Sequence, residues 1–191
     1  MHNLGKLALR IVIGGLFIGH GTQKLCGWFG GPGLQGTDRM MESIDMHPPR
    51  LNALAAGGTE AVGGAMLVAG CATPLAAAGL IGTMTTAIRK VHAKNGPWNA
   101  NRGWEFNAVM IAALTTLVDI GPGAVSVDAA KGKVRSGPGW ALAALAGGVL
   151  ASAMAIARGR RIAERAQAQE TVDAGTAETA AEEDAPAEHT P

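Results

Sequence analysis

Five stretches of mostly apolar residues, separated by short polar segments, make up most of the chain. They cover residues 4–22, 51–72, 74–91, 104–121 and 140–157. A helix needs about 20 mostly apolar residues to cross roughly 30 Å of hydrocarbon, and each stretch reaches or approaches that length. Gly30, Pro48, Pro74, Gly96 and Pro138 interrupt the pattern between the stretches. The pattern predicts five membrane-spanning helices.

The composition favours a lipid bilayer over a soluble bundle of buried helices. The chain is 48% hydrophobic and only 16% charged, which is little charge for a soluble domain. Glycine accounts for 28 residues, so the helices are expected to pack through small residues. Pairs at helical spacing, such as Gly15 with Gly19 and Gly57 with Ala61, predict where neighbouring helices approach. We interpret the chain as an all-α integral membrane protein.

Charge divides the chain near residue 161. Residues 1–161 carry 15 basic and 7 acidic side chains, whereas residues 162–191 carry 1 basic and 8 acidic ones. The second segment has almost no large apolar side chains with which to offset the entropy of ordering. We expect residues 162–191 to form a disordered acidic tail.

Lysine and arginine positions predict the orientation in the membrane. With the N-terminus outside, the inner connections hold eleven basic residues and the outer connections four. Cytoplasmic connections usually carry the excess, so the C-terminal tail is expected in the cytoplasm. Lys6 and Arg10 oppose this assignment locally, because they favour a cytoplasmic start of the first helix. We follow the total count.

Glu60 lies near the middle of the second predicted span, within a run of glycine and other small residues. An ionisable side chain in hydrocarbon is costly and usually paired or functional. Arg10, in the first predicted span, is the nearest cationic residue by depth. Two interpretations stay open: a structural ion pair or protonated glutamate, and a carboxylate that moves protons or grips a ligand.

A second group of polar residues is expected at the inner membrane face. Its members come from the ends of the first and third spans, the following loop and the start of the fourth span: His20, Gln23, Lys24, His92, Trp98, Asn99, Glu105 and Asn107. Donors, acceptors and an indole at one level predict a polar vestibule for a quinone ring, a small anion or a docking partner. His20 can act as an acid or base, or simply bond backbone at a helix end.

The chain has no sequence motif for several classes of chemistry. Metal-ligand spacings, nucleotide-binding loops, nucleophile motifs and haem attachment sites are missing from the sequence. We expect no metal site and no nucleic-acid partner. Cys26 and Cys71 are predicted on opposite sides of the membrane, so they are not expected to form a disulfide.

The polar segments resemble those of the DoxX family. The resemblance rests on residues 19–33 (GHGTQKLCGWFGGPG), Thr59 and Glu60 in a glycine-rich helix, residues 94–99 (KNGPWN), residues 103–107 (GWEFN), and residues 121–123 and 126–128 (GPG and SVD). It covers roughly residues 4–128. Cys26 departs from the pattern, because the family usually has an apolar aromatic residue there.

The resemblance implies a four-helix core over residues 1–128 in a bacterial inner membrane. Residues 129–161 then add a polar connection and a fifth span, and residues 162–191 add the tail. Similar proteins include small membrane subunits of thiosulfate:quinone oxidoreductase and a membrane anchor that assembles with superoxide dismutase and a sulfurtransferase. The resemblance therefore implies a role in redox and sulfur metabolism.

The leading hypothesis is a membrane subunit of a redox assembly, which anchors soluble enzymes and presents a quinone near His20, Lys24, Trp98 and Glu105. One alternative is a self-sufficient thiosulfate- or thiol-dependent quinone oxidoreductase, with Arg10, Lys24 or Arg89 binding the small sulfur anion and Glu60 moving protons. Another is a small-solute transporter, suggested by a mid-membrane Glu60. The sequence leaves the substrate and the oligomeric state open, a homo-oligomer included.

Overall fold

The computed structural model describes residues 3–183, with side chains described through residue 174, and every regular element in that range is helical. The α-helices are α1 (Asn3–Cys26), α2 (Gly33–Ser43), α3 (Pro49–Ala69), α4 (Thr73–Ala87), α5 (Glu105–Ile120), α6 (Val127–Ala130) and α7 (Pro138–Glu183). A π-helix (Ile88–His92) continues α4, and short 3-10 helices occupy Trp28–Gly30, Ala93–Asn95 and Asn99–Asn101. The all-α prediction is confirmed.

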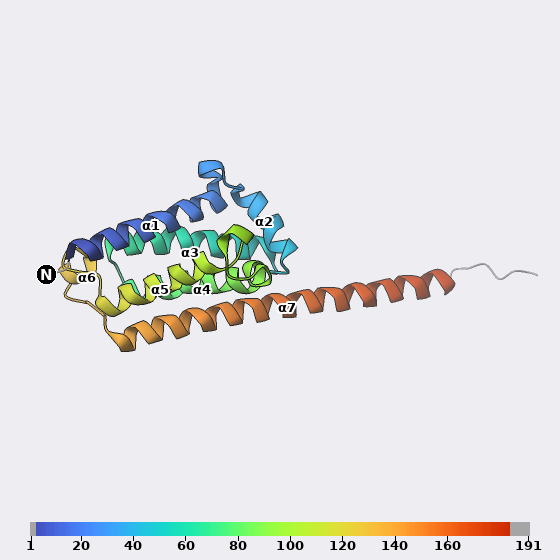
Figure 1. The fold of residues 1–191 in the computed structure, drawn as a ribbon. Coiled ribbons are helices and arrows are strands. Elements are labelled where there is room, and N and C mark those ends of the chain that lie inside the picture. Colours follow the sequence, from blue (N-terminus) through green and yellow to red (C-terminus); the bar gives the residue numbers. More distant parts are fainter. Residues whose placement is uncertain (1–2, 184–191) are drawn as a thin grey trace, which may run out of the picture.

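Five long helices run up and down along one axis, in the order α1, α3, α4, α5 and α7 (Figure 1). Helix α3 packs on α1 and α4, and α4 also packs on α5 and α7. Each of the five helices coincides with one of the predicted apolar stretches, with ends that differ by a few residues and with α7 extending well beyond its stretch. We call the end of the bundle where α1 begins the Arg10 end, and the end where α1 finishes the Lys24 end.

Two of the described helices, α1 and α7, are long and apolar enough to cross a membrane. Helices α4 and α5 have 15 and 16 residues, fewer than the roughly 20 that a simple span needs. The π-helix lengthens α4 by five residues. The crossing of the membrane by α3, α4 and α5 is therefore part of the proposed function.

The core lies where the five long helices meet. Its large side chains are aliphatic residues, two methionines and one phenylalanine: Ile13 and Phe17 of α1, Leu67 of α3, Leu80, Ile81 and Met84 of α4, and Met110, Leu114, Leu117 and Val118 of α5. Ala141 and Ala144 bring α7 onto this core. A smaller cluster at the Lys24 end holds Met41, Met46 and Ala53 against Ala155 and Ile156 of α7.

Glycine sets the closest helix contact, at the predicted Gly57 and Ala61 of α3 but not at the predicted residues of α1. A Cβ added at Gly14 would lie 2.6 Å from the Gly64 carbonyl oxygen, and one at Gly21 would lie 2.6 Å from that of Gly57. Gly15 and Gly19 face open space, so their predicted packing role is wrong. The spacing was right, but the face of α1 that meets α3 is rotated from the predicted one.

Two further elements differ from the sequence-based expectation. Helix α2 forms in a segment assigned only to a connection, and its buried Thr37 donates to the Lys24 carbonyl oxygen at 3.0 Å, at the end of α1. Helix α7 continues to Glu183, where a disordered tail is predicted from residue 162. Alanine and glutamate dominate this continuation, and both favour helix. Residues 184–191 of the predicted tail lie outside the described residues.

Candidate functional site

Glu60 and Lys24 form an ion pair in the interface between α1 and α3. Lys24 Nζ donates to Glu60 Oε2, and the side chains are 21% and 4% exposed, respectively. Side chains on a helix lean toward its N-terminus. Because α1 and α3 are antiparallel, the Lys24 side chain leans toward the Arg10 end and the Glu60 side chain leans toward the Lys24 end. Their charged groups therefore meet.

The expectation that Arg10 is the partner of Glu60 is wrong. Its guanidinium group is buried at the other end of α1 and donates to four backbone carbonyl groups, those of Leu67, Val68, Pro122 and Val125. Two of these carbonyls end α3, where helical partners run out. Arg10 thus ties the end of α3 to the loop that follows α5.

The same loop closes the Arg10 end through Asp128. Its Oδ1 accepts from the backbone amide of Ala72 at 2.8 Å, and its Oδ2 accepts from the amide and hydroxyl of Thr73 at 3.1 and 3.0 Å. These contacts supply a carboxylate to the start of α4, where free amides and the helix dipole favour negative charge. Ser126 Oγ caps α6 in the same way. The motif at residues 121–128 therefore has a structural use.

The predicted vestibule residues all lie toward the Lys24 end, but the side chains of His92 and Glu105 bond to backbone groups of the nearby connection. His92 Nδ1 donates to the Arg102 carbonyl oxygen at 2.7 Å, and Glu105 Oε1 accepts from the Asn99 amide at 2.6 Å. These bonds fold the connection between the π-helix and α5. The Trp98 carbonyl oxygen accepts from the amides of Asn101 and Gly103, and the residue is 64% exposed.

The remaining predicted residues contact α4, α5 and the first connection. The His20 ring meets the edge of Phe106 at 6.3 Å between centroids. Asn107 is buried and donates to Met84 Sδ at 3.4 Å, whereas Gln23 is half-buried and its backbone packs beside Gly31. His20 is exposed, and its predicted acid or base role stays a prediction.

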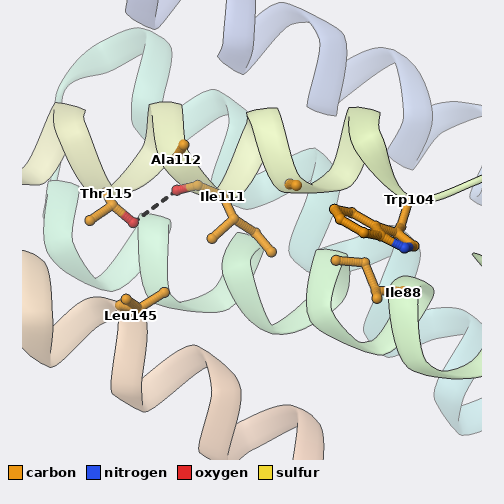
Figure 2. Close-up of a pocket in the computed structure, with 7 residues that line it drawn as sticks. Ile88, Trp104, Ile111, Ala112, Thr115 and Leu145 are labelled. Carbon is orange, nitrogen blue, oxygen red and sulfur yellow. Dashed lines mark hydrogen bonds between the residues drawn. The ribbon is translucent and has the colours of Figure 1, made fainter. Parts of the chain in front are cut away.

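An apolar groove lies beside this end, on the side of α5 that faces α7 (Figure 2). It has a volume of about 680 Å³ and is lined by Ile88 of the π-helix, by Trp104, Ala108, Ile111, Ala112 and Thr115, and by Leu145 of α7. The Thr115 hydroxyl donates to the Ile111 carbonyl oxygen at 2.8 Å, so it is satisfied within its own helix. We call this feature the α5–α7 groove.

Sequence reasoning missed this groove, because none of its lining residues belongs to the predicted site. The available signal was the spacing of Trp104, Ala108 and Ala112, which places all three on one face of α5. The two alanine side chains are small, so they leave a hollow next to the Trp104 indole. The π-helix that places Ile88 was not foreseeable from propensity. Such helices occur frequently at functional sites.

Metal and disulfide chemistry find no support in the described residues. No group of three or more His, Cys, Asp or Glu side chains lies close enough to hold a metal ion. Cys26 and Cys71 are free thiols at opposite ends of the bundle.

Comparison with known proteins identifies the first half of the bundle. The DoxX family model matches residues 5–93, whereas no curated protein and no solved structure matches the chain. The match ends before the segments at residues 94–128 that also resemble the family. Together with the apolar helices α1 and α7, it identifies a membrane protein. Residues 5–93, which contain the Lys24–Glu60 pair and helices α1 to α4, belong to the DoxX family.

Proposed function

We propose that the chain is a multi-pass membrane subunit of a redox assembly, which anchors soluble redox enzymes at the Lys24 end and holds a quinone in the α5–α7 groove. The observation that carries this proposal is the apolar groove beside Trp104, next to the polar connections of the Lys24 end. A lipid-soluble redox carrier and its water-soluble partners meet at such a boundary.

Outward apolar side chains support a position across the membrane for all five long helices. Val12, Val62, Leu75, Val109 and Leu150 come from five different helices and are each at least 60% exposed. Water would make this surface unfavourable, whereas lipid chains would not. Trp140 lies at the Arg10 end, and Trp28, Trp98 and Trp104 lie at the Lys24 end, as expected for aromatic anchors at two interfaces.

The Lys24 end is the proposed cytoplasmic face. The eleven basic residues counted for the inner connections all belong to this end of the bundle or to α7 beyond it. Trp28, Phe29 and Trp98 are 59%, 76% and 64% exposed there. Exposed aromatic side chains commonly anchor protein partners. By family resemblance, the proposed partners are a superoxide dismutase and a sulfurtransferase.

The residues of the α5–α7 groove fit a quinone. Its volume of about 680 Å³ lies within the roughly 300–1,000 Å³ of small-molecule sites. The aliphatic lining suits an isoprenoid tail, and the Trp104 indole N–H can donate to a ring carbonyl. A bound quinone would supply electron-carrier chemistry. Glu60 and His20 do not line the groove, so this proposal gives neither of them a direct contact with the quinone.

Quinone extraction from the purified protein tests this proposal. The Ala112→Phe substitution places a ring in the groove and should lower the quinone recovered per protein molecule. Val109→Phe adds the same ring to the same helix at an outward position and should leave recovery unchanged. Equal recovery from both variants, or no quinone in the unmodified protein, would overturn the assignment.

A further inference from the structure

Three arginines form a stripe on α7 just beyond its apolar segment. Arg158, Arg161 and Arg165 are all exposed, and they follow the stretch at residues 140–157 that contains no charged residue. With Met154, Ala157 and Ile162 they line a shallow groove of about 560 Å³. We call these three residues the arginine stripe.

The stripe faces away from the bundle. On the opposite side of α7, Ser152 contacts the Thr86 hydroxyl at 2.9 Å, and Gly159 lies so near His47 that an added Cβ would be 3.2 Å from its amide nitrogen. At 3.6 residues per turn, Arg161 lies roughly half a turn around the helix from these contacts, and Arg158 and Arg165 lie about a third of a turn away. This surface is therefore open to lipid at the edge of the proposed span.

The arginine side chains carry uncompensated charge. In the described part of the chain, none of the three forms an ion pair or a hydrogen bond through its guanidinium group. Guanidinium groups bind phosphate with paired N–H donors, and basic clusters beside a membrane span attract anionic lipids. Met154 and Ala157 precede the stripe on the side of the apolar segment, whereas Ile162 lies between Arg161 and Arg165.

We propose that the arginine stripe binds the phosphate of an anionic phospholipid in the leaflet at the Lys24 end. Met154, Ala157 and Ile162 contact the upper part of its acyl chains. A second copy of the chain packed in parallel on this face would set arginine against arginine, so like charges disfavour that occupant. The inference rests on the proposed crossing of the bilayer by α7.

Native mass spectrometry of the full chain in mild detergent tests the site, with phosphatidylglycerol and phosphatidylcholine as the added lipids. The unmodified protein should prefer phosphatidylglycerol. The triple variant Arg158→Gln, Arg161→Gln and Arg165→Gln should lose that preference by at least about tenfold, since each basic residue near an anionic surface contributes on the order of a fivefold effect. The matched control Arg39→Gln, Arg89→Gln and Lys94→Gln removes three exposed charges from the same end and should keep it.

Four results would overturn the site. Two concern the lipid preference: its absence in the unmodified protein, or an equal loss in the matched control. The other two are displacement of the lipid by inorganic phosphate, and a dimer that the arginine-stripe substitutions dissociate but the control substitutions do not. The third result would indicate a site for a free anion, and the fourth an interface between copies. Labelling of α7 from the two sides of the membrane, described below, separates failure of the site from failure of the span.

Discussion

Lys24 and Glu60 differ in how readily each side chain reaches water. Lys24 stands in the last turn of α1 and is 21% exposed, whereas Glu60 is 4% exposed between two helices. A flexible lysine can extend toward the Lys24 end when its partner is missing. Glu60 has no comparable route, so it depends on the pair more strongly.

Removing the two partners should therefore have unequal effects on stability. We expect Lys24→Met to lower the free energy of unfolding by about 3 kcal/mol, because it leaves a buried carboxylate unpaired. Glu60→Gln should cost roughly 1 kcal/mol, since Lys24 regains water. Thermal unfolding in detergent measures both, with Lys24→Met plus Glu60→Leu expected to recover much of the loss. Equal losses from the two single substitutions would contradict this account.

The need for a partner of Glu60 was predictable, but its identity was not. A carboxylate among glycines in an apolar helix requires a cation from another helix. Depth in the membrane, judged from the rise per residue, favoured Arg10 as the partner. That comparison ignores the direction in which each side chain leans from its helix. In the structure a Cβ at Gly57 would lie 3.3 Å from Lys24 Cβ, so Lys24 is only about one turn from Glu60.

The contact between α1 and α3 depends on two glycines of α1 that have no room for a side chain. Gly14 and Gly21 lie seven residues apart, which keeps both on one face of the helix. The neighbouring Gly15 and Gly19 meet no atom within 4 Å of an added Cβ. Gly14 and Gly21 are therefore suitable test sites, and Gly15 and Gly19 are suitable controls.

Gly21→Val should separate α1 from α3, because its Cβ would overlap the backbone of Gly57 and Ala61. We expect a loss of about 1–3 kcal/mol in stability, as for other overpacked interfaces. Thermal unfolding monitored by circular dichroism is the measurement. Gly19→Val carries the same helix-propensity change into open space, and an equal loss there would rule out the close contact as the cause.

At the element scale, hydrophobic runs predicted where the five long helices lie, because apolar length and glycine or proline breaks are local properties. The same runs did not reveal the π-helix, the α5–α7 groove or the face of α1 that meets α3. Each of these depends on how helices rotate against one another. The spacing of small residues shows that one face of a helix is suited to close packing. Which face meets the neighbouring helix is decided only by how the helices pack.

On the scale of the whole molecule, α7 runs along the bundle from the Arg10 end and continues beyond the Lys24 end (Figure 1). Its first part packs on α4 through Gly148, where an added Cβ would lie 2.7 Å from the Ala78 carbonyl oxygen. The family match stops at residue 93, so nothing in that match assigns α7 a role. Its crossing of the membrane requires a separate test.

Cysteine accessibility at Ser136 and Thr179 should report opposite sides of the membrane. Single cysteines are introduced into a Cys26→Ala, Cys71→Ala background and labelled with a membrane-impermeant reagent in intact cells. We expect labelling at position 136 and protection at position 179 until the membrane is opened, since the basic residues favour a cytoplasmic Lys24 end. Labelling of both positions in intact cells would show that α7 does not cross.

Affinity purification from native membranes in mild detergent tests the proposed function most directly. Co-purifying proteins are identified by mass spectrometry, and bound quinone is extracted from the same sample. We expect a superoxide dismutase or a sulfurtransferase to co-purify together with quinone. Bound quinone without any protein partner would contradict the subunit assignment and indicate an enzyme in its own right, whereas recovery of neither would contradict the proposed function as a whole.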